Sequence, residues 1–256
     1  MNFDQDKTVL DRLIVESMYF GASLDLVNFG DDILGYFTDE SAPGSNFIGF
    51  TTGEIERPDE KVLCAISLTR DRDVACSWIC ENERESHVAM VLENLGFYND
   101  FSFWGLVHDG SVVPATNNRN LKVEEVEVSY ARNFEEQMAI HLGCSLGYVQ
   151  IGLRDEDYPE NEKLRAFAVF ADSSQPAGFG FLVEAADSSV GVMRMAVVFP
   201  EFRNRGIYRE LTRVRLQEAH NAGLRHVVCH AYESSTPMLE NFGMVRYKHF
   251  TIYSSS

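Results

Sequence analysis

The sequence predicts a protein of the α/β (α+β) class with two domains, each a mixed, mostly antiparallel sheet flanked by helices. Three observations support this. Short apolar strand patterns alternate with helical patterns, and several strands are separated only by short turns, as in hairpins. A six-residue segment recurs near the end of each half of the chain. Between the two copies, one strand leads through a glycine-bearing turn directly into a helix.

The recurring segment sets the domain division. Residues 92–97 read LENLGF and residues 239–244 read LENFGM; each copy ends a helical pattern and precedes a strand. We expect Gly96 and Gly243 to be left-handed helix caps. Residues 108–122 contain glycine, proline and three asparagines without a clear period, as a linker does. The predicted domains are therefore 1–115 and 116–256.

Individual elements follow from hydrophobic periodicity, with period two or continuous apolar runs for strands and recurrence every three to four residues for helices. In the first half we expect a helix at 7–19, an apolar segment at 23–37, strands near 46–52, 61–68 and 73–80, and a helix near 83–95. In the second half we expect strands at 123–131, 164–171, 177–184, 189–199 and 226–230, helices at 133–143, 207–221 and 235–242, and a final strand.

Composition narrows the functional classes. The chain has 256 residues, 45% hydrophobic and 24% charged, with a formal net charge of −17. These fractions are typical of soluble globular proteins, and the negative charge argues against binding nucleic acid or an anionic membrane surface. The five cysteines have no zinc-like spacing, so we expect no metal site and reduced, buried thiols. The polar N-terminus and the lack of a long apolar run predict a cytoplasmic protein.

Residues 203–208, RNRGIY, are the strongest functional signal. An apolar strand precedes them and a helical pattern begins at Ile207. Such a turn directs several backbone N–H groups and a helix N-terminus towards one point, which suits a phosphate or pyrophosphate. Residues 192–226 also contain seven arginines and only three glutamates. These arginines either lie on an ordinary solvated helix face or form an electropositive entrance to a site for a polyanionic ligand. The glycine turn within the same segment favours the second interpretation.

The second half, roughly 123–253, resembles the GNAT superfamily of GCN5-related, acyl-CoA-dependent N-acyltransferases. The resemblance rests on the segment MAV at 195–197, PEFRNRGIY at 200–208, AGL at 222–224, HVVC at 226–229 and PMLENFGM at 237–244. It implies an acetyl-CoA (coenzyme A) site. The backbone amides of Arg203, Asn204, Arg205, Gly206, Ile207 and Tyr208 would wrap the pyrophosphate. Amides near Ala196, Val197 and Val198 would bind the pantetheine arm, in a gap between the fourth and fifth strands.

By this resemblance, the protein transfers an acyl group directly to a primary amine of a small molecule or peptide, as a monomer or homodimer. A non-catalytic acyl-CoA-binding sensor is the alternative. Two departures from the family pattern matter. Tyr208 stands where glycine or alanine is usual, so its ring either packs away from the cofactor or obstructs the site. Leu239 stands where the family often has a tyrosine that acts as general acid.

Proton-handling and acceptor residues are less well marked. Tyr232 is the nearest alternative acid in the sequence, and Glu184 on the preceding strand is a candidate base. A substrate pocket is expected to involve Asn46, Trp78 and His230. The first half resembles a degenerate GNAT-like domain, because it lacks an R-x-x-G-x-G motif before Gly96. Residues 69–73, between two expected strands, are also too few for a cofactor-binding helix.

Overall fold

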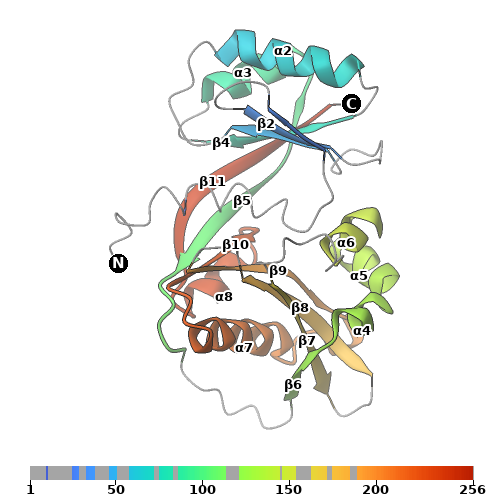
Figure 1. The fold of residues 1–256 in the computed structure, drawn as a ribbon, viewed down its shortest axis with the longest axis vertical. Coiled ribbons are helices and arrows are strands. Elements are labelled where there is room, and N and C mark those ends of the chain that lie inside the picture. The colour runs from blue at the N-terminus through green and yellow to red at the C-terminus, as the bar shows by residue number, and fades with distance from the viewer. Residues whose placement is uncertain are drawn as a thin grey trace. The chain divides into compact units, whose positions relative to one another are not determined.

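The computed structural model describes residues 10, 25–28, 33–37, 46–50, 58–71, 75–82, 86–113, 121–144, 146–153, 163–171, 175–184 and 189–255 (Figure 1). The chain forms two compact units. The C-terminal unit comprises Leu106–Val245, and the N-terminal unit comprises Asn2–Gly105 together with Arg246–Ser256. The predicted α/β class with mostly antiparallel sheets is confirmed.

The N-terminal unit is a sheet with helices on one face. Its strand order is β1-β2-β3-β4-β11-β5. These strands span Asp25–Asn28 (β1), Ile33–Phe37 (β2), Phe47–Phe50 (β3), Ser77–Glu81 (β4), Val245–Ser254 (β11) and Tyr98–His108 (β5). β3 and β4 are parallel, and the pairs β1–β2, β2–β3 and β4–β11 are antiparallel. Helices α2 (Pro58–Asp71) and α3 (Ser86–Asn94) cover the same face in Figure 1.

The strand expected at 61–68 is wrong, because this segment lies inside helix α2. Val62, Ala65 and Ile66 are buried, whereas Leu63 and Cys64 are exposed. Buried positions three to four residues apart form one helical stripe that packs on the sheet. The start signals of a helix are also present, with a proline at the first position and Asp59 and Glu60 in the first turn.

The C-terminal unit has the strand order β5-β10-β9-β8-β7-β6. Its further strands span Leu121–Val126 (β6), Lys163–Ala171 (β7), Pro176–Glu184 (β8), Val190–Val198 (β9) and His226–Ala231 (β10). The pairs from β6 to β9 are antiparallel, and β9 and β10 are parallel. The helices are α4 (Val128–Arg132), α5 (Glu135–Leu142), α6 (Leu146–Gly152), α7 (Ile207–Asn221), α8 (Thr236–Glu240) and the 3₁₀ turn η2 (Pro200–Phe202).

Helices lie on both faces of this sheet. Phe179 of β8 contacts the rings of Tyr130 and Phe134, which belong to α4 and the start of α5. The next residue, Gly180, lies against Arg215 of α7. Because successive residues of a strand point to opposite faces, α4 and α5 cover one face and α7 the other. The helix predicted at 207–221 is confirmed, whereas the strand expected at 123–131 gives way to α4 after Val126.

Two strands link the units through the chain itself. β5 follows α3 of the N-terminal unit but ends in the C-terminal unit, beside β10. β11 follows α8 of the C-terminal unit, yet Phe250 to Ser254 pair with β4. This pairing assigns Arg246–Ser256 to the N-terminal unit, unlike the predicted division at 115/116. The described helices include none that is both long and apolar enough to span a membrane.

Candidate functional site

Strand β9 contains one residue more than its partner β8 at its centre. Phe181 pairs with Arg194 and Gly180 pairs with Ala196, so Met195 has no partner in β8. The backbone φ of Met195 is 29°, a left-handed value that side-chain-bearing residues rarely adopt. Such a β-bulge bends the strand and increases its local twist. β9 therefore changes direction at Met195.

The parallel strands β9 and β10 pair only over the first four residues of each. Paired residues run from Val190 with His226 to Met193 with Cys229. Both strands continue, but in the described chain they form no further pairs with each other. Since the pairing stops just before the bulge, the two strands separate there. Backbone groups of β9 that face β10 beyond Met195 are therefore left for another partner.

The turn after β9 presents free amides at the start of α7. Asn204 and Gly206 have left-handed φ values of 61° and 79°, and no side chain caps the helix. The first backbone bond at this end runs from the N–H of Glu210 to the carbonyl oxygen of Gly206, at 3.0 Å. The N–H groups of residues 204–209 donate to no backbone carbonyl in the described chain. Unsatisfied amides at a helix N-terminus form an anion-binding site.

Three exposed arginines surround these amides. Arg203, Arg205 and Arg209 form no ion pair with a carboxylate among the described residues. The guanidinium of Arg205 lies over the ring of Phe202, and that of Arg209 over Phe242. Their charges therefore add to the positive end of the helix dipole.

Two arginines counted in this electropositive segment are not on its surface. Arg194 is 8% exposed and Arg215 is 2% exposed. The buried position of Arg215 could have been predicted from its spacing, because Leu211 and Ala219, four residues to either side, place it on the buried stripe of α7.

The side chain of Tyr208 points into the protein. Burial raises the pKa of Tyr208, against the opposing effects of Arg215 and a hydrogen bond with Ser235. Cys229 of β10, the last residue of that strand that pairs with β9, is also close to the phenol. The ring thus lies on the β10 side of α7, where the strands separate. The outer rim of the turn is left to the exposed residues 203–206.

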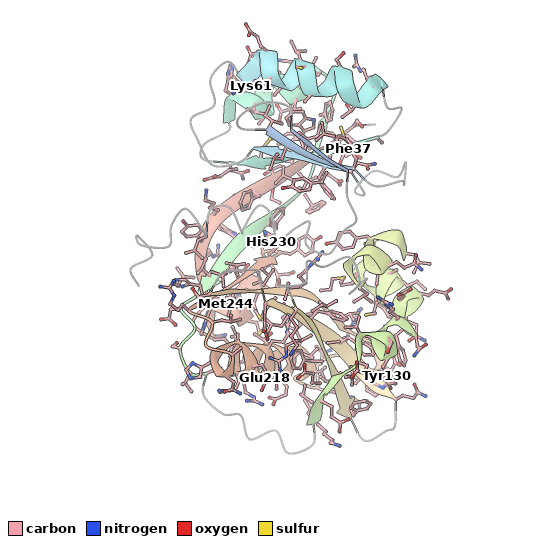
Figure 2. The ribbon with its side chains drawn as sticks, in the orientation of Figure 1. Phe37, Lys61, Tyr130, Glu218, His230 and Met244 are labelled. Carbon is pink, nitrogen blue, oxygen red and sulfur yellow. The ribbon has the colours of Figure 1, made fainter. Side chains whose placement is uncertain are left out.

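Two predicted site residues lie at the open end of β10. His230 directly follows the last paired residue and is half-buried (Figure 2). Tyr232 follows the end of the strand and is 56% exposed. Its carbonyl oxygen accepts hydrogen bonds from the hydroxyls of Ser235 and Thr236, at 3.0 Å each, which fixes the turn into α8.

Glu184 lies at the opposite end of the sheet. It pairs with Gly191 at the start of β9, five residues before Ala196. With a rise of roughly 3.3 Å per residue, this is about 16 Å along the strand. The carboxylate also forms an ion pair with Arg165, at 3.3 Å. The structure does not bring Glu184 to the bulge.

Two buried side chains of the C-terminal unit are chemically inert. Leu239 is 1% exposed, so no proton donor stands at its position. Burial raises the pKa of the Cys229 thiol to about 12, and its sulfur lies 3.6 Å from the sulfur of Met244. A thiol with such a pKa stays protonated near neutral pH and is a poor nucleophile. A cysteine-linked acyl intermediate is therefore disfavoured.

Asn46 and Trp78 are not pocket residues, which corrects the prediction for both. Each is 0% exposed. Trp78 belongs to the hydrophobic core of the N-terminal unit with Ile33, Ile48 and Leu92. The Asn46 amide donates to the carbonyl oxygen of Ala75 at 3.1 Å, which joins two backbone segments. Both side chains stabilise the unit and have no surface to offer a substrate.

No protein-family model matches the sequence, and no curated protein matches it. Solved structures share the fold at low identity. A GCN5-related N-acetyltransferase from Kribbella flavida is 13% identical over 96% of this chain and 95% of its own, with a TM-score of 0.72. A GCN5-related N-acetyltransferase from Sphaerobacter thermophilus is 12% identical over 88% and 76%, with a TM-score of 0.67. A tandem GNAT protein from the clavulanic acid biosynthesis pathway is 13% identical over 100% and 96%, with a TM-score of 0.58. The chain therefore has the fold of the GCN5-related N-acetyltransferases.

Proposed function

We propose that this protein is an acyl-CoA-dependent N-acyltransferase that uses acetyl-CoA and acylates a primary amine of a small molecule or peptide. The observation that carries the proposal is the pair of free backbone edges in the C-terminal unit. One is the turn of unpaired amides at residues 204–209, and the other is the β9 edge beyond the bulge. A ligand with an anionic group at one end and an amide-bearing chain at the other could bind the turn with its anion and the β9 edge with its chain.

The residues present fit coenzyme A at each point. The amides of residues 204–208 would hold the pyrophosphate, because they converge at the positive end of α7. The predicted part of the Arg203 amide is corrected, because this N–H donates to the carbonyl oxygen of Pro200 at 3.2 Å. Arg203 and Arg205 would add charge-assisted hydrogen bonds. The backbone of Ala196, Val197 and Val198 would bind the pantetheine arm. When bound, the group supplies a thioester-activated acyl carbon, and a β9 amide next to the bulge would polarise its carbonyl.

Acceptor chemistry would take place at the open end of β10. Tyr232 and His230 are the ionisable side chains that directly follow the paired part of this strand. A neutral imidazole can remove a proton from an amine, and a phenol can donate one. Positioning and carbonyl polarisation account for much of the rate in such transfers, so a weak acid at this point is compatible with turnover.

The buried Leu239 and the inward ring of Tyr208 favour a second candidate function. A protein with an intact pyrophosphate turn but no proton donor at residue 239 would bind acyl-CoA without using it, as a sensor. Thiol release from acetyl-CoA, measured over a panel of primary amines, distinguishes the two. Release with any amine identifies the transferase. Tight binding of acetyl-CoA without release over the whole panel identifies the sensor.

Two glycines at opposite ends of α7 allow a matched test of the binding site. Gly206, with φ 79°, precedes the helix, and Gly223, with φ 77°, follows it. Replacing either by Glu adds the same charge and similar backbone strain. We expect Gly206→Glu to abolish coenzyme A binding in calorimetry, because the carboxylate occupies the amide turn. Gly223→Glu is expected to bind like the wild type. Equal affinities for the two variants would refute the placement of the pyrophosphate.

A further inference from the structure

A buried arginine is bonded directly to the β9 bulge. Arg215 lies in the middle of α7, and its Nη1 donates to the carbonyl oxygens of Phe181 and Arg194, at 3.3 and 3.2 Å. Phe181 and Arg194 are the last paired residues of β8 and β9 before the extra residue Met195. One guanidinium therefore binds both strands at the point where the bulge shifts their register. Its Nε donates to Leu211 within the helix, at 3.1 Å, which fixes the side chain.

Arg215 has no carboxylate partner among the described residues. Its neighbours in the interior are instead the neutral phenol of Tyr208 and the neutral thiol of Cys229. Burying a charge without a counter-ion is costly, and only the hydrogen bonds that it makes offset the cost. Burial of the guanidinium alone therefore does not stabilise the protein. Its favourable contribution comes from the hydrogen bonds that it donates to the two carbonyl oxygens at the bulge.

The opposite side of the bulge is shaped to admit this guanidinium. Gly180 pairs with Ala196, just beyond Met195. A Cβ at Gly180 would lie 3.0 Å from Nε and 3.1 Å from Cζ of Arg215, closer than such atoms normally approach. The absence of a side chain at residue 180 therefore lets Arg215 reach the strands from α7.

We propose that Arg215 is a positioning residue that holds the β9 bulge open, so that those amides of residues 196–198 that do not face β8 stay turned towards the gap beside β10. The inference rests on the proposed coenzyme A site, because those amides are the groups that would bind the pantetheine arm. Met195 has an unfavourable left-handed φ, so the bulge needs an external bond to persist. Arg215 supplies that bond from a rigid helix.

The test compares Arg215→Met with Leu216→Ala. Methionine fills the site without a donor, and the neighbouring Leu216, which is 1% exposed, controls for a general loss of packing in α7. We expect hydrogen exchange of residues 194–198 in the ligand-free protein to be at least about tenfold faster in Arg215→Met than in Leu216→Ala. Coenzyme A affinity should fall roughly ten- to a hundredfold in Arg215→Met and about twofold or less in the control.

Further variants keep the proposal open to refutation. Arg215→Lys retains one cationic donor and should give intermediate exchange and affinity. If Arg215→Met does not fold, Gly180→Ala serves instead, because the new methyl group crowds Nε and Cζ of the same guanidinium. Exchange in residues 194–198 equal to that of the control, or wild-type affinity in a folded Arg215→Met, would overturn the positioning role. If the wild type itself fails to bind coenzyme A, the proposed function is refuted, while the exchange comparison still decides whether Arg215 holds the bulge.

Discussion

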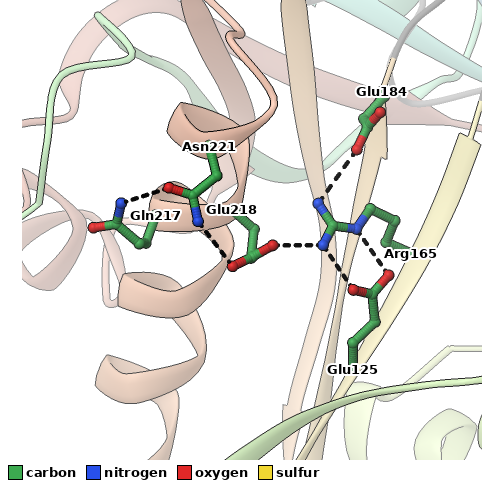
Figure 3. A network of polar contacts seen from close by, with 6 residues as sticks. All are labelled: Glu125, Arg165, Glu184, Gln217, Glu218 and Asn221. Carbon is green, nitrogen blue, oxygen red and sulfur yellow. Dashed lines mark hydrogen bonds and ion pairs between the residues drawn. The ribbon is translucent and has the colours of Figure 1, made fainter.

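Replacing Arg165 by methionine should change both the stability of the C-terminal unit and the dependence of that stability on pH. Arg165 of β7 is bonded to three carboxylates from three different elements (Figure 3). Its Nε and Nη2 donate to both oxygens of Glu125, at 2.8 and 2.7 Å. Nη2 also reaches Glu218 of α7 at 2.6 Å, and Nη1 reaches Glu184 of β8 at 3.3 Å.

The exposure of the partners sets the expected magnitude. The side chain of Arg165 is 10% exposed, whereas those of Glu125, Glu184 and Glu218 are 46%, 26% and 31% exposed. Exposed pairs contribute about 0.2–1 kcal/mol each, and removing one partner of a fully buried pair costs about 3–5 kcal/mol. This partly buried network falls between those limits. We therefore expect Arg165→Met to lower the free energy of unfolding by about 2–3 kcal/mol near pH 7.

The pH dependence gives a sharper signature. Arg165 lowers the pKa of Glu125 below its ordinary value in the folded protein. The unfolded chain then binds more protons near the ordinary glutamate pKa, so this stabilisation is lost as the pH falls through that range and below it. In Arg165→Met, three carboxylates lose the guanidinium that they share, and Lys163, whose effect on the pKa of Glu125 is smaller, is the cation that remains near them. Protonating one of them relieves repulsion, so the variant should gain stability relative to wild type between about pH 7 and about pH 5.

Urea denaturation followed by circular dichroism at the two pH values measures both effects. Lys122→Met is the matched control, because Lys122 on β6 pairs with Glu124 and its side chain is 74% exposed. The control should lose less than about 1 kcal/mol and keep the wild-type pH slope. The reasoning is refuted if Arg165→Met is as stable as the control, or if its stability difference from wild type is the same at both pH values.

Three further predictions concern other buried groups. Gly110→Ala should cost about 3 kcal/mol or more in urea denaturation, since φ is +68° and a Cβ would lie 2.4 Å from a backbone oxygen of Leu224; Gly143→Ala, at φ +69° with open space, should cost only about 1 kcal/mol. Burial lowers the pKa of His108, so wild-type stability should decline as the pH falls through about 6.5, and His108→Gln should flatten that slope. A thiol reagent read by mass spectrometry should label the exposed Cys64 in the folded protein and spare Cys229; labelling of Cys229 would contradict its raised pKa.

Local signals in the sequence predicted the turn and the helix of the candidate site. The glycine before Ile207 and the periodicity to residue 221 describe α7 as observed, and Gly96 and Gly243 have left-handed φ values of 89° and 87°. Each of these features depends on a few neighbouring residues. The role of Arg215 depends instead on carbonyl oxygens of two strands, more than twenty residues away in the chain. From the composition of residues 192–226 alone, Arg215 was expected to be a surface charge.

Long-range pairing also explains what was missed in the first half. Trp78 was a candidate for a pocket because aromatic side chains line pockets and cores alike. Its burial depends on β3, α2 and α3 packing around β4. The apolar run within residues 61–68 allowed either a strand or a helix, and tertiary packing of one stripe decided for the helix. The transfer of β11 to the sheet of the N-terminal unit has no local signal at all.

Because residues 61–68 belong to helix α2, the N-terminal unit does contain a helix at the position that corresponds to α7. Both units contain a strand, a helix and a parallel strand in succession, β3–α2–β4 and β9–α7–β10. The first half therefore does contain a helix, α2, that connects two parallel strands as α7 does. The difference lies in the net charge at each helix start, because the one carboxylate in the first turn of α7, Glu210, is ion-paired with Arg213 at 2.6 Å. Asp59 and Glu60 stand in the first turn of α2, where carboxylates satisfy the positive end of the helix dipole and repel another anion. At α7 the amides have no capping side chain, and Arg203, Arg205 and Arg209 add positive charge around them. Electrostatics, rather than the absence of a helix, would restrict the proposed phosphate-binding role to the C-terminal unit.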